Sequence, residues 1–599
     1  MTLRTTLMEL RRTITASSRQ PPRNAPMLTR SRPFVFAMTL VLTIGFGIGN
    51  ASADGFGGLL EFLGVGADDN GACTGDGCNQ NNKPICPAAV ADPVWTYNGS
   101  LHLSYTDLVV GQKFPIQIER KYDSRSTFDS AVGYGWAFAH DRRLYEYPDG
   151  SIVVRTGCGN KGKFVYSGGA YIAPTGGPTG ELTAQGNGTY ALRYSNGNTD
   201  LFDADGRLSA FLLHTGERHE FLYDSGGRLP LIGTSPKSVD PNKPILVAYQ
   251  ARLTRIQERG SDGELTGYFV DFQYSNATGR LTKLVSNDGR EVNFVHDVHL
   301  GATRGNLVSV NGLTDYSQSF AYVVSTANNP DPHNITSIVN GTDADPVAIR
   351  YDNSDRVKGQ DEGATIWSFA YPATGTTTII QDVLNSNGTR QKRTTTKIFN
   401  PGGYLSKDID PYGNEVRYFY DGSKDLTRVE LWEKQGTNLV LIKAVDSTYN
   451  GQSQKLTESV TLDVVGTQSA EVITSSWTYD NGWVASEQIV SNKSPQIFRT
   501  EYTFVRDAQN RPVNIAQVKQ RKDDGSFATT TFTYCSTAEA AEANSTCPDV
   551  RLVKQIDGPR TDVSDIATAA YYGTTDISDC ALTTGNCFHR GDRKSITNA

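Results

Sequence analysis

The sequence predicts an all-β protein, built as a repetitive array of antiparallel β-hairpins that form a spiral β-shell, and three observations support this. Tyr (28) and Gly (58) are plentiful while Met (4) is scarce, a mixture that suits aromatic strands and turns better than helices. Short apolar stretches such as Val270–Tyr274 are separated by turn residues such as Asp205-Gly206. A degenerate unit of aromatic residue, Asp, turn, Gly, Arg and aliphatic residue also recurs along the chain.

Length and charge limit the classes of protein to which the chain can belong. Its 599 residues allow several domains or one long repeat array. The formal net charge is −7, but the first 53 residues carry seven Arg and one Glu, so the remainder has a net charge of −13. An acidic chain has no overall field that attracts phosphate backbones. We therefore expect no nucleic acid partner.

Residues 1–53 have the three parts of a secretory signal peptide. An Arg-rich stretch precedes an apolar run at 34–49, and Ala51-Ser52-Ala53 forms a small-residue cleavage site. Met27 is an alternative start that would give a shorter basic region. The apolar run is about 16 residues long, shorter than the roughly 20 that an uncleaved membrane helix needs. We expect export to the periplasm, the cell surface or the medium, with no membrane span after signal cleavage.

Residues 54–91 are predicted to form a flexible linker that contains cysteines. The stretch 68–82 is small and polar and has no periodicity. It superficially resembles a calcium loop, but it lacks the Gly and Glu positions of the EF-hand register. No metal site is therefore expected in it.

Eight Cys residues, an even number in an exported chain, predict disulfides. The last four are close enough in sequence to form two local pairs, Cys535 with Cys547 and Cys580 with Cys587. The sequence leaves the connectivity open. A zinc site is disfavoured because the chain has no Cys-x-x-Cys pair. Between the first two of these cysteines, Ala538–Ala543 is a short helical candidate.

The recurring unit is clearest at Phe202–Leu208 and Tyr223–Leu229, and a looser copy begins at Tyr351. The aromatic ring ends one strand, and the Asp accepts hydrogen bonds from turn amides. Gly supplies a positive φ, and Arg with an aliphatic residue opens the next strand. Each unit is a hairpin corner that has to stack on its neighbours to bury its face. The residues to which we assign this role are Phe202, Asp203, Gly206, Arg207, Tyr223, Asp224, Gly227, Arg228, Leu229, Tyr351 and Asp352.

This unit resembles the YD repeat of Rhs proteins, insecticidal toxin complex subunits and teneurins. The block before it strengthens the resemblance, because three stretches there are similar to the motifs of the domain that opens the Rhs shell. These stretches are Thr106-Asp107-Leu108, Arg120–Ser124 and Gly133–Trp136. The Cys-bearing segment after Phe532 is similar to a segment of exported members. Together the similar regions cover residues 92–599.

The resemblance implies an Rhs-type N-terminal β domain at 92–200, a YD-repeat β-shell at 201–530 and a Cys-rich continuation of the array at 531–599. In the family, a strip of antiparallel sheet spirals into a hollow shell, which in many members encloses a C-terminal toxin behind a self-cleaving core. This sequence shows no core motif and no toxin domain before Ala599. We therefore expect a truncated shell, whose open edge would pair with a downstream chain or with toxin cargo.

Sequence motifs for catalysis or cofactor binding are lacking. The chain has no Gly-x-Ser-x-Gly, no His-Glu-x-x-His and no phosphate loop. On a strand, His296 and His299 would point to opposite faces, which disfavours a metal pair. Arg142-Arg143, beside His140, is interpreted as a solvated turn. We therefore expect neither an enzyme nor a protein that binds a cofactor or a metal.

Three functions remain open at this point. The first is an exported shell or scaffold of a polymorphic toxin used in intercellular competition, which encloses or presents a C-terminal effector not present in this chain. The second is a cell-surface protein that binds glycans or another protein through exposed Tyr and Trp. The third is a carbohydrate-active enzyme, since the carboxylates of glycosidases need no local motif.

Overall fold

The computed structural model describes residues 89–90 and 94–598, apart from short internal stretches, of which 225–251, 324–331 and 574–590 are the longest. The predicted signal peptide at 1–53 and nearly all of the predicted linker at 54–91 lie outside the described residues. Among the described residues, no helix is long and apolar enough to cross a membrane.

Residues 89–172, here called the first domain, form three small sheets. Their strand orders are β1-β2-β3-β4-β7, β11-β10-β9-β8 and β5-β6. The strands are β1 (Ala89–Val90), β2 (Val94–Trp95), β3 (Ser100–Val110), β4 (Ile116–Asp123), β5 (Asp129–Ser130), β6 (Gly133–Tyr134), β7 (Trp136–Phe138), β8 (Arg143–Glu146), β9 (Ile152–Arg155), β10 (Lys161–Ser167) and β11 (Ala170–Ile172).

The rest of the described chain forms one antiparallel sheet of 30 strands, in which each strand pairs with the next one in the sequence. Its first half contains β12 (Gly180–Gly186), β13 (Thr189–Tyr194), β14 (Thr199–Phe202), β15 (Leu208–Leu212), β16 (Arg218–Tyr223), β17 (Leu253–Arg259), β18 (Leu265–Tyr274), β19 (Leu281–Ser286), β20 (Glu291–His296), β21 (Leu307–Asn311), β22 (Ser317–Tyr322), β23 (Ile335–Asn340), β24 (Val347–Tyr351), β25 (Val357–Glu362) and β26 (Thr365–Ala373).

Its second half contains β27 (Thr376–Leu384), β28 (Arg390–Phe399), β29 (Leu405–Ile409), β30 (Glu415–Tyr420), β31 (Leu426–Gln435), β32 (Asn438–Tyr449), β33 (Lys455–Leu462), β34 (Glu471–Asp480), β35 (Trp483–Ser491), β36 (Ser494–Arg506), β37 (Pro512–Arg521), β38 (Phe527–Tyr534), β39 (Val553–Asp557), β40 (Ile566–Tyr571) and β41 (Arg593–Asn598). The all-β prediction and the predicted array of antiparallel hairpins are therefore confirmed.

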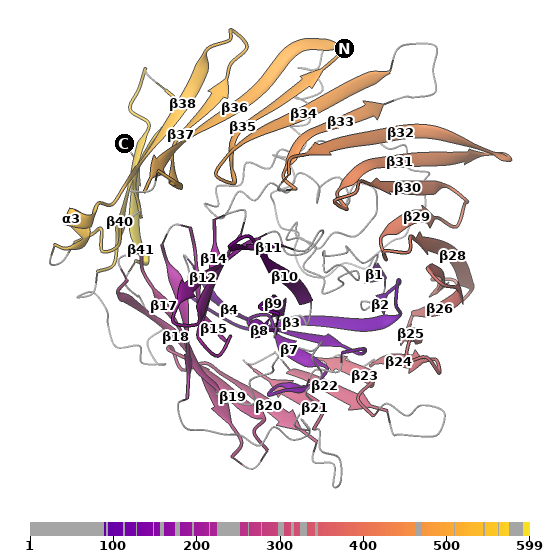
Figure 1. The fold of residues 1–599 in the computed structure, drawn as a ribbon. Coiled ribbons are helices and arrows are strands. Elements are labelled where there is room, and N and C mark those ends of the chain that lie inside the picture. The colour runs from indigo at the N-terminus through magenta and orange to yellow at the C-terminus, as the bar shows by residue number, and fades with distance from the viewer. Residues whose placement is uncertain are drawn as a thin grey trace.

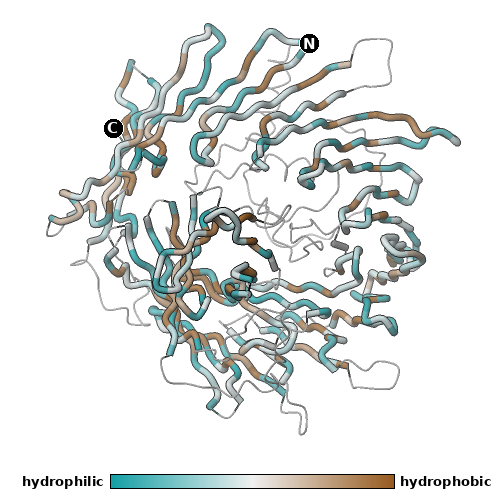
Figure 2. Tube along the Cα trace, in the orientation of Figure 1, coloured by the Kyte–Doolittle hydropathy of each residue, from teal (hydrophilic) through white to brown (hydrophobic). Residues whose placement is uncertain are grey.

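The long sheet curls into an open shell around the first domain (Figure 1). Hydrophobic and hydrophilic residues alternate along many of its strands (Figure 2). In β18, for example, Tyr268, Val270 and Phe272 are buried, while the residues between them are more exposed. This alternation turns one face of the strand toward the first domain. A single hydrophobic cluster accordingly runs from Val94 in β2 to Ile379 in β27.

A repeated β-bulge accompanies the curvature of the sheet. Leu201 pairs with Ala210 but Phe202 pairs with Leu208, so Ser209 is an extra residue in its strand. The same shift recurs at twelve further corners, beside the last residue of the first strand at eleven of them and one residue earlier, at Tyr479, in β34. A bulge bends its strand and increases the local twist. Repetition at corresponding ends of successive hairpins accounts for the curling of the sheet.

The second half of the shell is less covered than the first. In β35 every residue is half-buried, and in β34 all residues but one are half-buried. A strand covered on both faces would have fully buried residues along its length, and a strand covered on one face would alternate between buried and exposed residues. These strands therefore form a single layer whose two faces both remain partly accessible.

The predicted helical candidate at Ala538–Ala543 corresponds to α3 (Thr537–Ala540), a single turn between two cysteines. Ser536 caps it, because its hydroxyl accepts a hydrogen bond from the Glu539 N–H while the Glu539 carboxylate accepts one from the Ser536 N–H. The predicted domain boundaries remain predictions. The long sheet itself runs from Gly180 to Asn598.

Candidate functional site: the corners of the shell and the first domain

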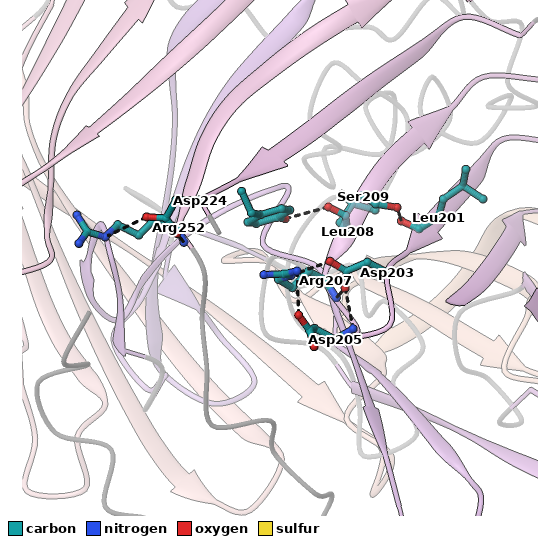
Figure 3. Close-up of polar contacts among 9 residues, drawn as sticks. Leu201, Asp203, Asp205, Arg207, Leu208, Ser209, Asp224 and Arg252 are labelled. Carbon is teal, nitrogen blue, oxygen red and sulfur yellow. Dashed lines mark hydrogen bonds and ion pairs between the residues drawn. The ribbon is translucent and has the colours of Figure 1, made fainter. Parts of the chain in front are cut away.

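The corner at Asp203 shows how the recurring unit is closed (Figure 3). The Asp203 N–H donates to the Arg207 carbonyl at 2.9 Å. Its Oδ1 accepts the N–H groups of Asp205 at 3.0 Å and Arg207 at 2.9 Å, and its Oδ2 accepts the guanidinium Nε–H of Arg207 at 2.7 Å. Gly206 has a φ of +73°, which favours glycine. Phe202, at the end of β14, is buried next to this turn.

The copy at Tyr351 has the same geometry. Asp352 Oδ1 accepts the Arg356 N–H at 3.0 Å, and its Oδ2 accepts the Arg356 Nε–H at 2.9 Å. The guanidinium then lies over the next tyrosine ring, 4.3 Å from the centroid of Tyr371. Arg207 lies in the same way over Tyr223, at 4.9 Å. Each arginine therefore links its own turn to the following hairpin.

The corner at Tyr223 differs from the sequence prediction in its second half. Asp224 donates its N–H to the carbonyl of Arg252 at 3.0 Å, and its Oδ1 accepts the Arg252 N–H at 2.9 Å (Figure 3). Arg252 and Leu253 thus occupy the positions of the unit that we assigned from the sequence to Arg228 and Leu229. The predicted Gly227, Arg228 and Leu229 lie outside the described residues.

Tyrosines join successive corners along one side of the sheet. The hydroxyl of Tyr223 donates to the carbonyl of Leu208 at 2.9 Å, and that of Tyr274 donates to Leu253 at 2.8 Å. Each acceptor pairs, in the sheet, with the aromatic residue of the preceding corner: Leu208 pairs with Phe202, and Leu253 pairs with Tyr223. Similar hydroxyl-to-carbonyl bonds are made by Tyr322, Tyr351, Tyr371, Tyr420, Tyr449, Tyr479, Tyr534 and Tyr571. A buried phenol therefore has a fixed partner at nearly every step of the shell.

A hydroxyl residue at the bulge is a part of the unit that the sequence analysis missed. Ser209 Oγ donates to the carbonyl of Leu201 at 3.0 Å (Figure 3). The equivalent hydroxyl bonds are made by Thr254, Thr282, Thr336, Ser406 and Thr427. The signal was available, because Ser or Thr directly follows the Leu or Ile that opens each of these strands. The hydroxyl satisfies a carbonyl at the point where the bulge interrupts the ladder.

The first domain is bonded to several corners through backbone groups. The N–H of Leu281 donates to the carbonyl of Ala131, and the N–H of Val357 donates to that of Gly99, both at 2.8 Å. The Leu144 N–H donates to the Gly206 carbonyl at 2.8 Å. A Cβ at Gly206 would collide with the Leu144 carbonyl, so this corner needs glycine for close approach as well as for its φ. The first domain therefore acts as an internal scaffold for the first half of the shell.

The three motif stretches of the first domain converge on one buried ion pair. The Arg120 guanidinium donates to both carboxylate oxygens of Asp107, with Nε–Oδ2 at 2.9 Å and Nη2–Oδ1 at 3.0 Å. Its Nη2 also donates to the side-chain oxygen of Gln318 in β22, at 2.6 Å. The guanidinium lies 4.6 Å from the Trp136 ring, and both charged side chains are fully buried. Residues of the three motifs thus form a buried, neutralised ion pair where the first domain contacts the shell.

Tyr122 and Trp136 extend this contact. The Tyr122 hydroxyl donates to the His333 carbonyl at 2.7 Å, and Trp136 Nε1–H donates to the Tyr322 hydroxyl at 3.1 Å. Gly135 has a φ of +78°, and a Cβ there would lie 2.9 Å from the Tyr122 ring. The glycine of the Gly-x-Gly-Trp stretch is therefore required by both backbone conformation and packing.

Three histidines lie where the first domain meets the shell. Nε2 of His296 bonds to the Val132 carbonyl at 2.7 Å, and Nε2 of His219 bonds to the Phe114 carbonyl at 3.0 Å. The ring of His140 packs against those of Phe221 and Phe272 in the shell. Burial lowers the pKa of all three imidazoles to about 4. These histidines are therefore neutral when the first domain is in place.

The interpretation of Arg142-Arg143 as a solvated turn is wrong for Arg142. Its Nη1 lies 2.7 Å from Oδ1 of Asp200, whose side chain is fully buried, and the Tyr194 hydroxyl donates to the other oxygen at 2.5 Å. Burial acts to lower the pKa of Arg142, but the Asp200 carboxylate raises it above its ordinary value. This half-buried charge pair connects the first domain to β14. The sequence could not show it, because the partner lies 58 residues away.

Within the described part of the chain, no group of three or more His, Cys, Asp or Glu side chains could hold a metal ion. His296 bonds to the backbone as given above, and His299 lies outside the described residues. Cys535 and Cys547 form the local disulfide that the sequence predicted. Cys580 and Cys587 lie outside the described residues.

Comparisons with known proteins give one family match and several structural likenesses. Residues 91–164 match the family model described as a domain of unknown function, DUF6531. This stretch contains the buried ion pair and the three motifs. None of the curated proteins matches the sequence.

Among solved structures, the chain is similar to the TcdB2-TccC3-Cdc42 complex, with 13% identity, a TM-score of 0.32 and coverage of 78% of this chain and 27% of that chain. It is also similar to the Photorhabdus luminescens Tc holotoxin pore, with 14% identity, a TM-score of 0.28 and coverage of 79% and 30%. The similarity to TcdB2-TccC3 has 13% identity, a TM-score of 0.27 and coverage of 79% and 32%. The chain thus spans about a third or less of these matched chains.

Proposed function

We propose that this chain is an exported shell protein of the Rhs/YD-repeat kind, which encloses or presents a toxin effector used in intercellular competition. The observation that carries the proposal is the shape of the long sheet. Its first half is filled by the first domain, whereas β34 and β35 form a single layer with partly accessible faces. Such a layer offers many half-buried polar and apolar side chains to a polypeptide held inside the curl.

A role as a scaffold without catalysis is part of the proposal. The polar side chains that recur in this sequence take part in corners, bulges and contacts of the first domain. Asp203 and Arg207 close a turn, and Asp107 and Arg120 neutralise each other in the core. These uses are structural, which supports a container over an enzyme.

Export and pairing at the edge are further parts of the proposal. The disulfide between Cys535 and Cys547 suits an oxidising compartment. The sheet order ends at β12 and at β41, and each of these strands has one strand partner in the described structure. A free edge is a template for another strand, so a downstream chain or the cargo itself could pair there.

A protection assay tests enclosure. A short unstructured reporter is fused to the C-terminus of the mature chain, and the matched control carries the same reporter at the mature N-terminus. We expect trypsin to digest the C-terminal reporter at least about tenfold more slowly than the control, because an enclosed segment is cleaved only when the shell opens. Equal digestion of the two reporters would contradict enclosure.

A second function, binding of surface glycans, is favoured by one observation. Tyr412, in the turn between β29 and β30, is 78% exposed, and Tyr166 in β10 is 53% exposed. Exposed aromatic rings are suited to stacking on sugars. If glycan binding is the function, the intact mature chain will bind a glycan array without cargo, and Tyr412→Ala or Tyr166→Ala will reduce that binding.

A further inference from the structure

The C-terminal end of the curled sheet meets the β17–β18 hairpin in side-chain contacts that we call the seam. Ser261, in the turn between β17 and β18, donates its hydroxyl to Oδ1 of Asp549 and to the carbonyl of Val550, both at 2.9 Å. The hydroxyl of Tyr268 in β18 donates to Oδ1 of Asp592, beside β41, at 2.5 Å. In Figure 1, β40 and β41 return to the side of the molecule where β17 and β18 lie.

The seam is buried, but it is not a continuation of the sheet. Asp549, Asp592 and Tyr268 are each less than 9% exposed. The sheet order nevertheless ends at β41, so no ladder of backbone bonds joins this strand to β17 or β18 in the described structure. The ladders elsewhere in the shell are made of backbone bonds, whereas the seam bonds given above, among the described residues, start from side chains. Side-chain contacts of this kind can open locally without breaking a ladder, so the seam is a place where the curl can open.

The loop that carries Asp549 belongs to an unusual corner. Cys535 donates its N–H to the Leu552 carbonyl at 2.9 Å, as Asp203 does to Arg207 in the corner described above. Cys535 thus occupies the aspartate position, but its side chain cannot hold turn amides as a carboxylate does. A disulfide to Cys547, two residues before Asp549, holds this longer loop instead.

A groove lies next to this disulfide. The groove has a volume of about 500 Å³ and is lined by Cys547 together with Glu539, Lys554 and residues of β40 and β41. The cysteines themselves are 2% and 5% exposed and pack on Leu552 and Tyr571. A thiol reagent that enters the groove would reach the Cys547 side of the bond, next to the seam.

We propose that the Cys535–Cys547 disulfide is a redox lock on the seam of the shell. A dithiol reductant of the thioredoxin class transfers two electrons and two protons to the disulfide, which leaves two cysteine thiols, while the dithiol becomes a disulfide. The loop then loses its cross-link, Asp549 leaves Ser261, and the curl opens between β41 and the β17–β18 hairpin. On the proposed function, this keeps the seam closed in an oxidising compartment and opens it in a reducing cytosol.

Hydrogen exchange of the full mature chain tests the lock without any cargo. The oxidised protein is compared with the protein after treatment with dithiothreitol and with the Cys535→Ser/Cys547→Ser variant, which removes this one disulfide and leaves the other cysteines intact. We expect exchange at residues 259–266 and 545–550 to become at least about tenfold faster in both cases, because local opening becomes more frequent. Exchange in the pair β27–β28, far from the seam, is expected to remain unchanged.

Two outcomes would overturn the proposal. One is faster exchange at 545–550 with unchanged exchange at 259–266, since the disulfide would then hold only its own loop. The other comes from Ser261→Ala/Tyr268→Phe, which removes both donating hydroxyls and should open the seam while the disulfide stays intact. Unchanged exchange at 259–266 would show that these bonds do not close the seam. If the cysteine variant exchanges faster at all residues, the test rests on the wild-type protein alone, by comparing its exchange before and after treatment with dithiothreitol. If the reporter is not protected but exchange at the seam responds to reduction as expected, the enclosure function is rejected and the redox lock is retained.

Discussion

Arg120 illustrates how single residues of the first domain hold the molecule together. Its charge is fully buried and is neutralised by Asp107 from the same sheet, while Gln318 from the shell takes a further hydrogen bond. Both charged residues belong to motifs that can be recognised in the sequence. The contact with the shell could not be predicted from the sequence, since Gln318 lies 198 residues further along the chain.

Replacement of Arg120 by Met should destabilise the protein strongly. The variant leaves the Asp107 carboxylate buried without its counter-charge, and loss of one partner of a buried pair costs about 3–5 kcal/mol. The double variant Arg120→Met/Asp107→Leu removes both charges and should recover much of this loss. Calorimetric unfolding of the three proteins measures the difference.

A matched control is the pair of Arg428 and Asp446, which is in contact at 2.7 Å but whose side chains are 37% and 46% exposed. Arg428→Met should change stability by only about 0–1 kcal/mol, because solvent screens the pair. If Arg120→Met is as mild as Arg428→Met, the buried pair does not anchor the first domain.

At the scale of the hairpin, the corner was predictable where its parts are close in sequence. The residues from Phe202 to Leu208 form one short pattern, and the structure places Asp203 and Arg207 in contact. Asp224 makes the same bonds with the backbone of Arg252, 28 residues away, and no local pattern can reveal a corner that contains so long an insertion. The hydroxyl at the bulge was visible in the sequence, but its purpose depends on a shift in strand register that only the structure shows.

The bulge hydroxyl should stabilise its hairpin. Ser406 Oγ donates to the carbonyl of Ile398 at 2.9 Å in the corner between β28 and β29. Ser406→Ala leaves this half-buried carbonyl without that donor and should cost about 1 kcal/mol. Ser406→Thr is the matched control, because threonine holds the same place at Thr427 and should keep the bond. Thermal unfolding distinguishes them, and equal midpoints for the Ala and Thr variants would show that the hydroxyl is dispensable.

At the scale of the whole molecule, the β class and hairpin array followed from composition and alternation, but the relation between the first domain and the shell did not. Ion pairs such as that of Arg142 with the buried Asp200 join segments that are distant in the chain, so we interpreted Arg142 as solvated from the sequence. The same contact contains three histidines that burial keeps neutral. Docking of the first domain therefore couples to pH.

Acidification should release the first domain from the shell. The pKa of His140, His219 and His296 falls from 6.5 to about 4 on burial, so the docked state binds fewer protons than the undocked state. Docking is therefore fully stable above pH 6.5 and weakens as the pH falls toward 4, by at most about 1.4 kcal/mol per histidine for each pH unit. Hydrogen exchange of β3 and β4 between pH 7 and pH 4 follows the release, after correction for the pH dependence of intrinsic exchange.

His296→Gln tests whether imidazole protonation causes this release. Glutamine does not titrate in this range, and its amide can still donate to the Val132 carbonyl that His296 contacts. Combined with His219→Gln, it removes two of the three titrating groups, so the midpoint of release should move to lower pH. A wild-type midpoint in the double variant would mean that other groups, such as carboxylates, govern docking. A lower pH midpoint would show that protonation of these imidazoles releases the first domain, so that its docking to the shell depends on their neutral form.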